Sequence, residues 1–430
     1  MSTDTATRPA SVPAESGTVA RKRSFKAPIA FTFFAVVAFV AFGLFGEAGQ
    51  TSTFGISTRS DFVQIEPIAV SSRLVAVILS LICLALAAYS FVLARRGERI
   101  PVWLTATFCV AFILAFLTWA VAGAQINLTS LLSGTLALSI PIIFGALSGV
   151  LCERSGVINI AIEGQLLAGA FLSAVVASLT GSHVAGLVAA VVAGLLVAIV
   201  LAVFTVTYFV NQIIVGVVLN VLVLGVTNFL YGRLLAPEGE TWNSPGRLPR
   251  IKIPLLGDIP VIGPVLFNQT IIVYLMYAAV IAIQIALFRT RWGLRVRAVG
   301  EHPQAADTLG IRVNSIRFRN VLLGGMVAGL GGAFFTLGNV GSFSKEISAG
   351  QGFIALAAMI FGRWSPVGAL GAALLFGFAN TLQSVLGIIG TPIPSEFMLM
   401  APYLATIFAV AGLVGRVRAP AADGEPYIKA

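Results

Sequence analysis

Long apolar runs separated by short polar loops make up most of this chain. Nearly every run approaches the ~20 residues that an α-helix needs to cross a bilayer, and only 351–362 is clearly shorter. The pattern predicts an all-α, polytopic integral membrane protein with about 10–12 transmembrane helices, including broken or re-entrant segments. The twelve segments are 28–46, 74–94, 102–123, 129–150, 157–180, 184–209, 212–232, 271–288, 319–338, 351–362, 366–389 and 397–415.

Polar residues interrupt the run 157–180 near its beginning, where the sequence reads GVINIAIEGQLLAG and contains Asn159, Glu163 and Gln165. On a helix, Asn159 and Glu163 share one face because they lie four positions apart. An ionisable residue at membrane depth is costly and usually faces a cavity or a partner, so these three residues are candidates for a substrate pathway. The alternative is a structural Glu163 near the cytoplasmic interface, paired with Arg154.

Asparagine and glutamine residues also occur in and beside the next run. Asn220 lies in the middle of the segment 212–232 and is the best candidate among them for lining a pathway. Single Asn residues in membrane spans often serve only as hydrogen-bond partners between helices, and that interpretation stays open. The others are Asn211, Gln212 and Asn228.

The stretch Gly350–Gly371 has an apolar part too short to cross untilted, and GRWSPVG then breaks it. Half-helices of this kind are tolerated where they line a cavity or are buried in protein, so Gln351 and Phe353 are further pathway candidates. An ordinary short span with a tight cytoplasmic turn is the alternative. The glycines of GGMVAGLGGA at 324–333 instead indicate close helix packing.

The stretch 289–319 is a charged island between two apolar runs. Within it, Pro303–Gly310 predicts a short helix, with Pro in the first turn and Gly as a stop. Ala305 and Ala306 would give this helix a smooth face for a partner protein. Since the helix has nothing of its own to pack against, it suggests a contact surface for a cytoplasmic protein. The basic residues of the island are Arg289, Arg291, Arg295, Arg297, Arg312, Arg317 and Arg319, against the acids Glu301 and Asp307.

Positive charges between spans indicate the orientation of the chain, because Lys and Arg resist translocation. Threading the twelve segments alternately from a cytoplasmic N-terminus leaves seven of the 27 Lys and Arg residues outside and the remaining 20 inside. The opposite orientation reverses that ratio, so both termini are predicted to be cytoplasmic. The seven outside are Arg59, Arg73, Arg233, Arg247, Arg250, Lys252 and Lys345.

The loops and tails follow from this threading. Residues 1–27 form a disordered cytoplasmic tail, because the Ser/Thr/Ala/Pro-rich beginning has no periodicity. The run 28–46 is near spanning length and no A-x-A site follows, so it is an uncleaved span rather than a signal peptide. Of two extracellular loops, 47–73 and 233–270, the second is rich in Pro and Gly. It suggests a folded cap with short strands or turns, acting either as a receiver for a substrate-delivery protein or as a plain lid.

Composition excludes several classes of protein. The chain is 58% hydrophobic and 10% charged, whereas a soluble domain carries roughly 25% charged residues. The net charge of +10 is spread between apolar runs rather than gathered on one face, so orientation explains it better than nucleic acid does. The cysteines have no CxxC spacing and only two histidines occur, which indicates neither a disulfide framework nor a metal site. They are Cys83, Cys109, Cys152, His183 and His302.

The sequence also lacks the motifs of catalysis. No GxxxxGK[ST] phosphate loop and no G-x-S-x-G nucleophile elbow occurs. The chain therefore is not its own P-loop ATPase, and the hypothesis of a membrane enzyme has little support. Many spans, a few polar mid-span residues and one cytoplasmic helix are instead typical of a transport subunit with no cofactor of its own.

Three blocks resemble the permease subunits of bacterial ABC importers in the branched-chain amino acid/simple sugar permease family. They are SGVLCERSGVINIAIEGQLLAGA (148–170), GLRVRAVGEHPQAADTLGI (293–311) and GQGFIALAAMIFGRWSPVGALGAALLFG (350–377). The first block is most similar to the nucleoside branch of that family. The resemblance covers about 129–415 and implies an all-helical, multi-pass permease in the bacterial plasma membrane.

The resemblance further implies the partners of the chain. These are a second, related permease, a cytoplasmic ABC ATPase that binds ATP and magnesium, and an extracytoplasmic substrate-binding lipoprotein. The family's ATPase-contacting loop matches Gly300, Glu301, His302, Pro303, Ala305, Ala306 and Gly310, with His302 where many relatives have Asn. Asn159 and Glu163 match the polar signature of the first block.

The resemblance also divides the chain. It predicts a permease core at 129–415, containing the cytoplasmic coupling loop 289–319 and the extracellular loop 233–270. The segment 28–128 then includes a transmembrane extension, because the family core needs fewer than twelve spans. Residues 416–430 form a cytoplasmic C-terminal tail.

The leading hypothesis is an ATP-driven nucleoside importer permease that works by alternating access. A permease for a simple sugar such as ribose or galactose is the alternative within the same class. An ion-coupled secondary transporter, with Glu163 as the coupling carboxylate, is the alternative from a different class.

Overall fold

The computed structural model describes residues 25–46, 49–57, 64–98, 100–390, 396–397, 400 and 418–429. Contacts between residues divide the chain into two compact units. Unit 1 comprises 1–48 and 73–119, and unit 2 comprises 49–72 and 120–430.

Unit 1 is a group of three apolar helices. Helix α1 (Lys26–Val37) continues through a π-helical turn, Ala38–Leu44, and packs with α2 (Ser72–Arg95) and α3 (Val102–Ala120). Aromatic rings fill their contacts: Phe42 lies 5.5 Å from Phe116 and 5.2 Å from Trp119 between ring centroids. Ring pairs at these distances add to the burial of apolar surface.

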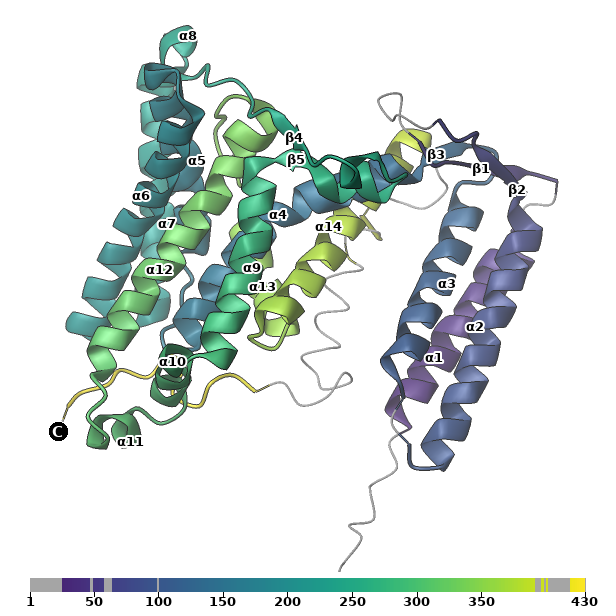
Figure 1. Ribbon diagram of the computed structural model, residues 1–430, viewed down its shortest axis with the longest axis horizontal. Helices are drawn as coiled ribbons and strands as arrows, with labels where there is room; N and C mark the ends of the chain where they lie inside the picture. Colours follow the sequence, from purple (N-terminus) through teal and green to yellow (C-terminus); the bar gives the residue numbers. More distant parts are fainter. Residues whose placement is uncertain are drawn as a thin grey trace, which may run out of the picture. The chain divides into compact units, whose positions relative to one another are not determined.

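Unit 2 contains the long helices α4 to α7, α9, α12 and α14 and the short helices α8, α10, α11 and α13 (Figure 1). Helices α5, α6 and α12 lie side by side, and α4 crosses between α12 and α14 (Figure 1). Their bounds are α4 Leu128–Glu153, α5 Ile162–Thr180, α6 His183–Ala202, α7 Gln212–Leu230, α8 Gly239–Trp242, α9 Ile271–Arg289, α10 Arg291–Glu301, α11 Pro303–Thr308, α12 Val313–Ala333, α13 Gln351–Phe361 and α14 Pro366–Ile389.

Short strands join the loops of unit 2. Strand β1 (Thr51–Gly55) lies between β2 (Ile68–Ser71), which is antiparallel to it, and β3 (Gln125–Asn127), which is parallel. Strands β4 (Arg250–Lys252) and β5 (Asn268–Thr270) form an antiparallel pair. The loop 233–270 therefore contains the strands and turns that its Pro and Gly content predicts.

Glycines bring α6 and α12 into close contact, as the sequence predicts for 324–333. A Cβ on Gly329 would lie 2.2 Å from the carbonyl oxygen of Ala190, and one on Gly194 would lie 2.1 Å from that of Gly325. Backbones approach this closely only where side chains are absent.

Ten helices of the described residues are long and apolar enough to cross a membrane, and each corresponds to one of the twelve predicted segments. The segment 351–362 forms α13, an apolar helix of only 11 residues. Of the twelfth segment, 397–415, the structure describes only residues 397 and 400. The prediction of a polytopic helical membrane protein is confirmed, whereas the cytoplasmic placement of the termini stays a prediction.

Candidate functional site

The first turns of α5 and α13 meet inside unit 2. The Glu163 carboxylate accepts hydrogen bonds from the Ser348 hydroxyl at 2.6 Å, the Gly350 amide at 2.9 Å and the Gly352 amide at 2.6 Å. These amides belong to the first turn of α13, whose N–H groups have no partner within the helix. A carboxylate there also complements the positive end of the helix dipole. Glu163 thus caps α13, which agrees with a structural role that holds helices together, but it forms no ion pair with Arg154 among the described residues.

Asn159 lies in a non-helical segment, Arg154–Ala161, before α5 begins at Ile162. The prediction that Asn159 and Glu163 share one helix face is therefore wrong. The chain leaves α4 at Gly156, whose φ of +87° favours glycine. Fully buried, Asn159 donates from Nδ2 to Oε1 of Gln165 at 3.0 Å and to Oγ of Ser148 at 3.2 Å.

Asn220 connects α7 to the start of α5. Its Oδ1 accepts a hydrogen bond from the Gly164 amide at 2.8 Å, and its Nδ2 donates to the Ile160 carbonyl at 2.8 Å. The side chain is 8% exposed and uses both ends of its amide. This geometry agrees with the interpretation of Asn220 as a hydrogen-bond partner between helices.

Gln351 and Phe353 differ in their surroundings. Oε1 of Gln351 is buried without a hydrogen-bond partner in the described structure, whereas the Phe353 side chain is 51% exposed. The structure brings Asn159, Glu163, Gln165, Asn220 and Gln351 to the beginnings of α5 and α13. We name these five residues the interior polar cluster.

The depth of the interior polar cluster follows from the length of α13. At the opposite end of that helix, Trp364 donates to Glu153 at 2.5 Å, and Nε of Arg154 donates to the Trp364 carbonyl at 2.9 Å. Eleven helical residues span about 16 Å, roughly half of the ~30 Å hydrocarbon core. Glu163 therefore lies about one length of α13, or half of the hydrocarbon core, away from the charged end of α4. Helix α13 is thus a half-helix, and half-helix N-termini at such depth are typical of binding sites in transporters.

The predicted coupling helix exists as α11 (Pro303–Thr308). Ala305 is exposed, but Ala306 is only 2% exposed and packs against Val299, Val313 and Tyr427. The two alanines do not form one exposed face, and the expectation that the helix has nothing to pack against is wrong.

The other predicted coupling residues differ in exposure. Glu301, His302 and Gly310 are exposed, whereas Pro303 is buried and a Cβ on Gly300 would lie 2.3 Å from the Arg154 carbonyl oxygen. The end of α10 thus packs directly on the turn that follows α4. Burial lowers the pKa of the Arg154 guanidinium, and the nearby Glu301 carboxylate opposes that shift.

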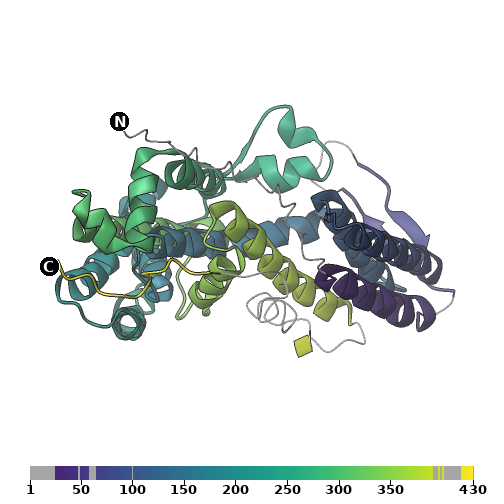
Figure 2. The same ribbon diagram turned by 90° about the horizontal axis from the view of Figure 1, so that it is seen from below.

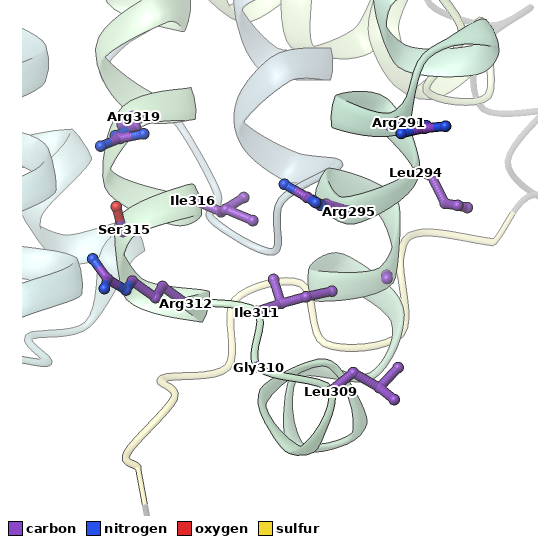
Figure 3. Close-up of a pocket in the computed structure, with 11 residues that line it drawn as sticks. Arg291, Leu294, Arg295, Leu309, Gly310, Ile311, Arg312, Ser315, Ile316 and Arg319 are labelled. Carbon is purple, nitrogen blue, oxygen red and sulfur yellow. The ribbon is translucent and has the colours of Figure 1, made fainter.

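A groove of about 790 Å³ lies between α10, α11 and α12. Figure 3 shows Arg291 and Arg295 on the α10 side and Arg312 and Arg319 on the α12 side, above Leu309 at the end of α11. None of the four arginines forms an ion pair within the described part of the chain. The groove therefore offers four positive charges beside α11 to an acidic partner.

Sequence reasoning missed the C-terminal segment 418–429, which crosses the lower ends of the unit 2 helices (Figures 1 and 2). Its anchor on α12 is Arg317, which is 2% exposed and donates to the carbonyl oxygens of Glu425 and Ala422. The signal for this contact was Tyr427, the one aromatic residue of a tail made mostly of small and charged residues. Within the described residues, no group of three or more His, Cys, Asp or Glu side chains is placed to hold a metal ion.

Comparisons with known proteins agree with this architecture. The family described as branched-chain amino acid transport system / permease component matches residues 131–414. A guanosine ABC transporter permease, NupQ of Bacillus subtilis, is 42% identical over 70% of this chain and 97% of its own length. A nucleoside ABC transporter permease, NupC of Lactococcus lactis, is 41% identical over 70% of this chain and 98% of its own. A putative glucose permease, TsgC13 of Haloferax volcanii, is 31% identical over 59% of this chain. No solved structure matches the chain.

Proposed function

This chain belongs to the branched-chain amino acid transport system permease family, and we propose that it is the membrane-spanning subunit of an ATP-driven importer of nucleosides. The observation that carries the proposal is its 42% identity to a guanosine permease over 97% of that protein. The sugar permease is more distant, at 31% identity over a smaller part of this chain. Nucleosides are therefore favoured over free sugars.

The interior polar cluster supports a substrate pathway at this depth. Gln351 contributes a buried amide oxygen without a hydrogen-bond partner in the described structure, whereas Asn220 and Glu163 hold the surrounding helix ends in place. A nucleoside carries several donors that an amide oxygen accepts. We assign substrate contact to Gln351 first, with Asn159 and Gln165 supporting the walls of the site.

Glu163 is a poor coupling carboxylate for an ion-driven transporter. Both of its oxygens accept hydrogen bonds, and two of these three bonds come from backbone amides at the start of α13. Removing or neutralising that charge would uncap the helix rather than only change an ion site. Energy from a partner ATPase agrees better with this geometry than an ion gradient does.

The ATPase would contact the exposed residues of α10 and α11. Glu301, His302 and Ala305 lie on this surface, and the arginine-lined groove beside it suits acidic residues of the partner. Movement of α11 with the ATP cycle would then open the interior polar cluster alternately to the two sides. ATP and magnesium would be bound by the partner chain.

A second permease would complete the pathway. The same two bacteria each have another permease that resembles this chain: NupP of Bacillus subtilis at 26% and NupB of Lactococcus lactis at 25% identity. Two related permeases in one organism support pairing of unlike subunits. An extracytoplasmic lipoprotein would deliver the nucleoside to the loop 233–270.

Uptake of labelled guanosine, adenosine, uridine and ribose, by cells with and without this chain, tests the proposal. We expect nucleoside uptake to require the chain and ATP, to persist when an ionophore collapses the ion gradients, and to be competed by nucleosides but not by ribose. Ribose uptake alone would favour the sugar permease, and uptake that stops with the ionophore at constant ATP would favour ion coupling.

Ala305→Arg provides the test of the coupling surface, since Ala305 is exposed on α11 and an arginine there would block ATPase contact without filling the core. The matched control is Glu98→Arg, which adds the same side chain at an exposed loop position of unit 1. We expect only Ala305→Arg to abolish uptake at unchanged membrane abundance. Normal uptake by this variant would exclude α11 as the ATPase contact.

A further inference from the structure

The C-terminal segment 418–429 lies beyond the family match, which ends at residue 414. It has no helix or strand of its own, yet it makes specific contacts with three parts of unit 2. Most tails are poorly ordered unless something ties them down. The contacts of the segment 418–429 show which parts of unit 2 it connects.

The segment first contacts α10 and α11. The Ala422 amide donates to the Gly300 carbonyl at 2.9 Å, and the Ala421 amide donates to Oε2 of Glu301 at 3.3 Å. Tyr427, 7% exposed, packs in an apolar cluster with Val299, Ala306 and Val313. The coupling helix therefore rests on a tyrosine from the far end of the chain.

The segment then contacts the turn between α4 and α5. A Cβ on Gly156 would lie 3.0 Å from the Ala422 carbonyl oxygen, and a Cβ on Gly424 would lie 2.8 Å from Cδ1 of Ile158. Ile158 directly precedes Asn159 of the interior polar cluster. One short segment thus touches both the coupling helix and the chain that leads into the membrane interior.

We propose that residues 418–429 form a clasp that transmits movement of α11 to the turn 154–158, with Tyr427 as its positioning residue on α11. The segment is hydrogen-bonded to α10 on one side and packs against Ile158 on the other. Displacement of α11 therefore moves Ile158, which directly precedes Asn159 of the interior polar cluster. The direct contact of Gly300 with Arg154 also connects α10 to this turn, but it reaches only the first residue of the turn. The clasp extends that contact to Ile158.

This proposal rests on the proposed function, because it places an ATPase at α11. Its test uses the complete importer complex in proteoliposomes and measures labelled guanosine transported per ATP hydrolysed, together with recovery of the ATPase in the purified complex. The variant is Tyr427→Ala. Tyr427→Phe keeps the ring, and Ile428→Ala is the control because the neighbouring Ile428 side chain is 70% exposed.

We expect Tyr427→Ala to retain the ATPase and its hydrolysis but to lower guanosine transported per ATP by about fivefold or more, the lower range of coupling between distant sites. Tyr427→Phe restores the ratio and Ile428→Ala leaves it unchanged. An unchanged ratio in Tyr427→Ala overturns the proposal. Loss of the ATPase from the complex also overturns it, since the segment would then serve docking rather than transmission.

A chain ending at Val417 gives a second, independent measurement should Tyr427→Ala fail to accumulate. It removes the whole clasp, and we expect hydrolysis that continues while transport per ATP falls. Full transport by the shortened chain overturns the clasp. Absence of ATP-dependent guanosine uptake by the unmodified complex is a different result, because it contradicts the proposed function itself.

Discussion

Glu163 and Gly352 hold the beginnings of two half-buried helices together: Oε2 of Glu163 accepts the Gly352 amide proton at 2.6 Å. A Cβ on Gly352 would lie 2.5 Å from the Cα of Glu163. The hydrogen bond therefore requires a residue without a side chain at position 352. Charge and steric fit at this one contact set the position of α13 against α5.

Gly352→Ala should destabilise the protein, because the added methyl group meets backbone atoms that cannot move aside. Overpacking of this kind costs about 1–3 kcal/mol. Gly371→Ala on α14 is the matched control, since nothing lies within 4 Å of a Cβ there. Thermal unfolding in detergent measures both variants, followed by a thiol-reactive dye that reaches the buried Cys83 and Cys152 only on unfolding, once the exposed Cys109 has been blocked by alkylation. Equal stability of the two would show that α13 shifts freely.

Glu163→Gln should lower stability and uptake together. A neutral amide can still accept from Ser348 and Gly350, but its NH₂ group then faces the Gly352 amide, donor against donor. Losing hydrogen bonds to a charged group costs about 1.5–3 kcal/mol. Glu346→Gln, the same change at an exposed position, should leave unfolding and uptake unchanged. Full stability with uptake abolished would instead give Glu163 a role in transport chemistry.

Asn220→Leu should separate α7 from the start of α5. The change leaves the Gly164 amide and the Ile160 carbonyl without their partner, and an unsatisfied buried polar group costs about 1–3 kcal/mol each. Val221→Leu, at a side chain that is 64% exposed, is the control. Unfolding temperature and guanosine uptake are compared in both. A stable but inactive Asn220→Leu protein would indicate that Asn220 touches the substrate.

The sequence predicts well whatever depends on length and local chemistry. Ten of the twelve predicted hydrophobic runs form spanning helices among the described residues, and Pro303 with Gly310 predicts α11, because these signals act within one segment. The start of α5 is different. The residues VINIA at 157–161 are as apolar as a helix, but the Ile158 amide bonds to Oε1 of Gln212 at 2.6 Å. A tertiary hydrogen bond thus accompanies a segment that does not continue the helix.

The burial of Ala306 was equally beyond local reasoning. Nothing in the sequence around Pro303 indicates that Tyr427, more than a hundred residues later, covers this helix. Likewise, Arg317 looks like one more positive charge of a cytoplasmic loop, yet it is buried and binds two carbonyls of the C-terminal segment. Long-range contacts of single residues carry no periodicity that a sequence pattern can show.

Asp423 makes the attachment of the C-terminal segment depend on pH. Burial raises the pKa of this carboxyl from 3.8 to about 7, although its hydrogen bonds with Glu153 and Gly424 and the charge of Arg317 lower it. The surrounding groups are the Glu153 carboxyl of α4, with which it interacts, the Arg317 guanidinium of α12, which opposes the shift, the Gly424 amide and the Cys152 thiol. A raised pKa means that the attached segment binds a proton more tightly than the detached one. Attachment is therefore strongest at low pH, weakens as the pH rises towards 7, and changes little above it.

The protection of the Ala422 amide, which donates to the Gly300 carbonyl, measures this attachment by hydrogen exchange of the C-terminal peptide. We expect a protection factor about thirtyfold higher at pH 5.5 than at pH 8, after division by the intrinsic exchange rate, as linkage to one carboxyl raised from 3.8 to about 7 requires. Asp423→Asn stays neutral at both values and should abolish the difference, whereas Glu425→Gln, at an exposed carboxyl, should preserve it. Protection that rises with pH, or that depends equally on pH in Asp423→Asn, would assign the titration to another group.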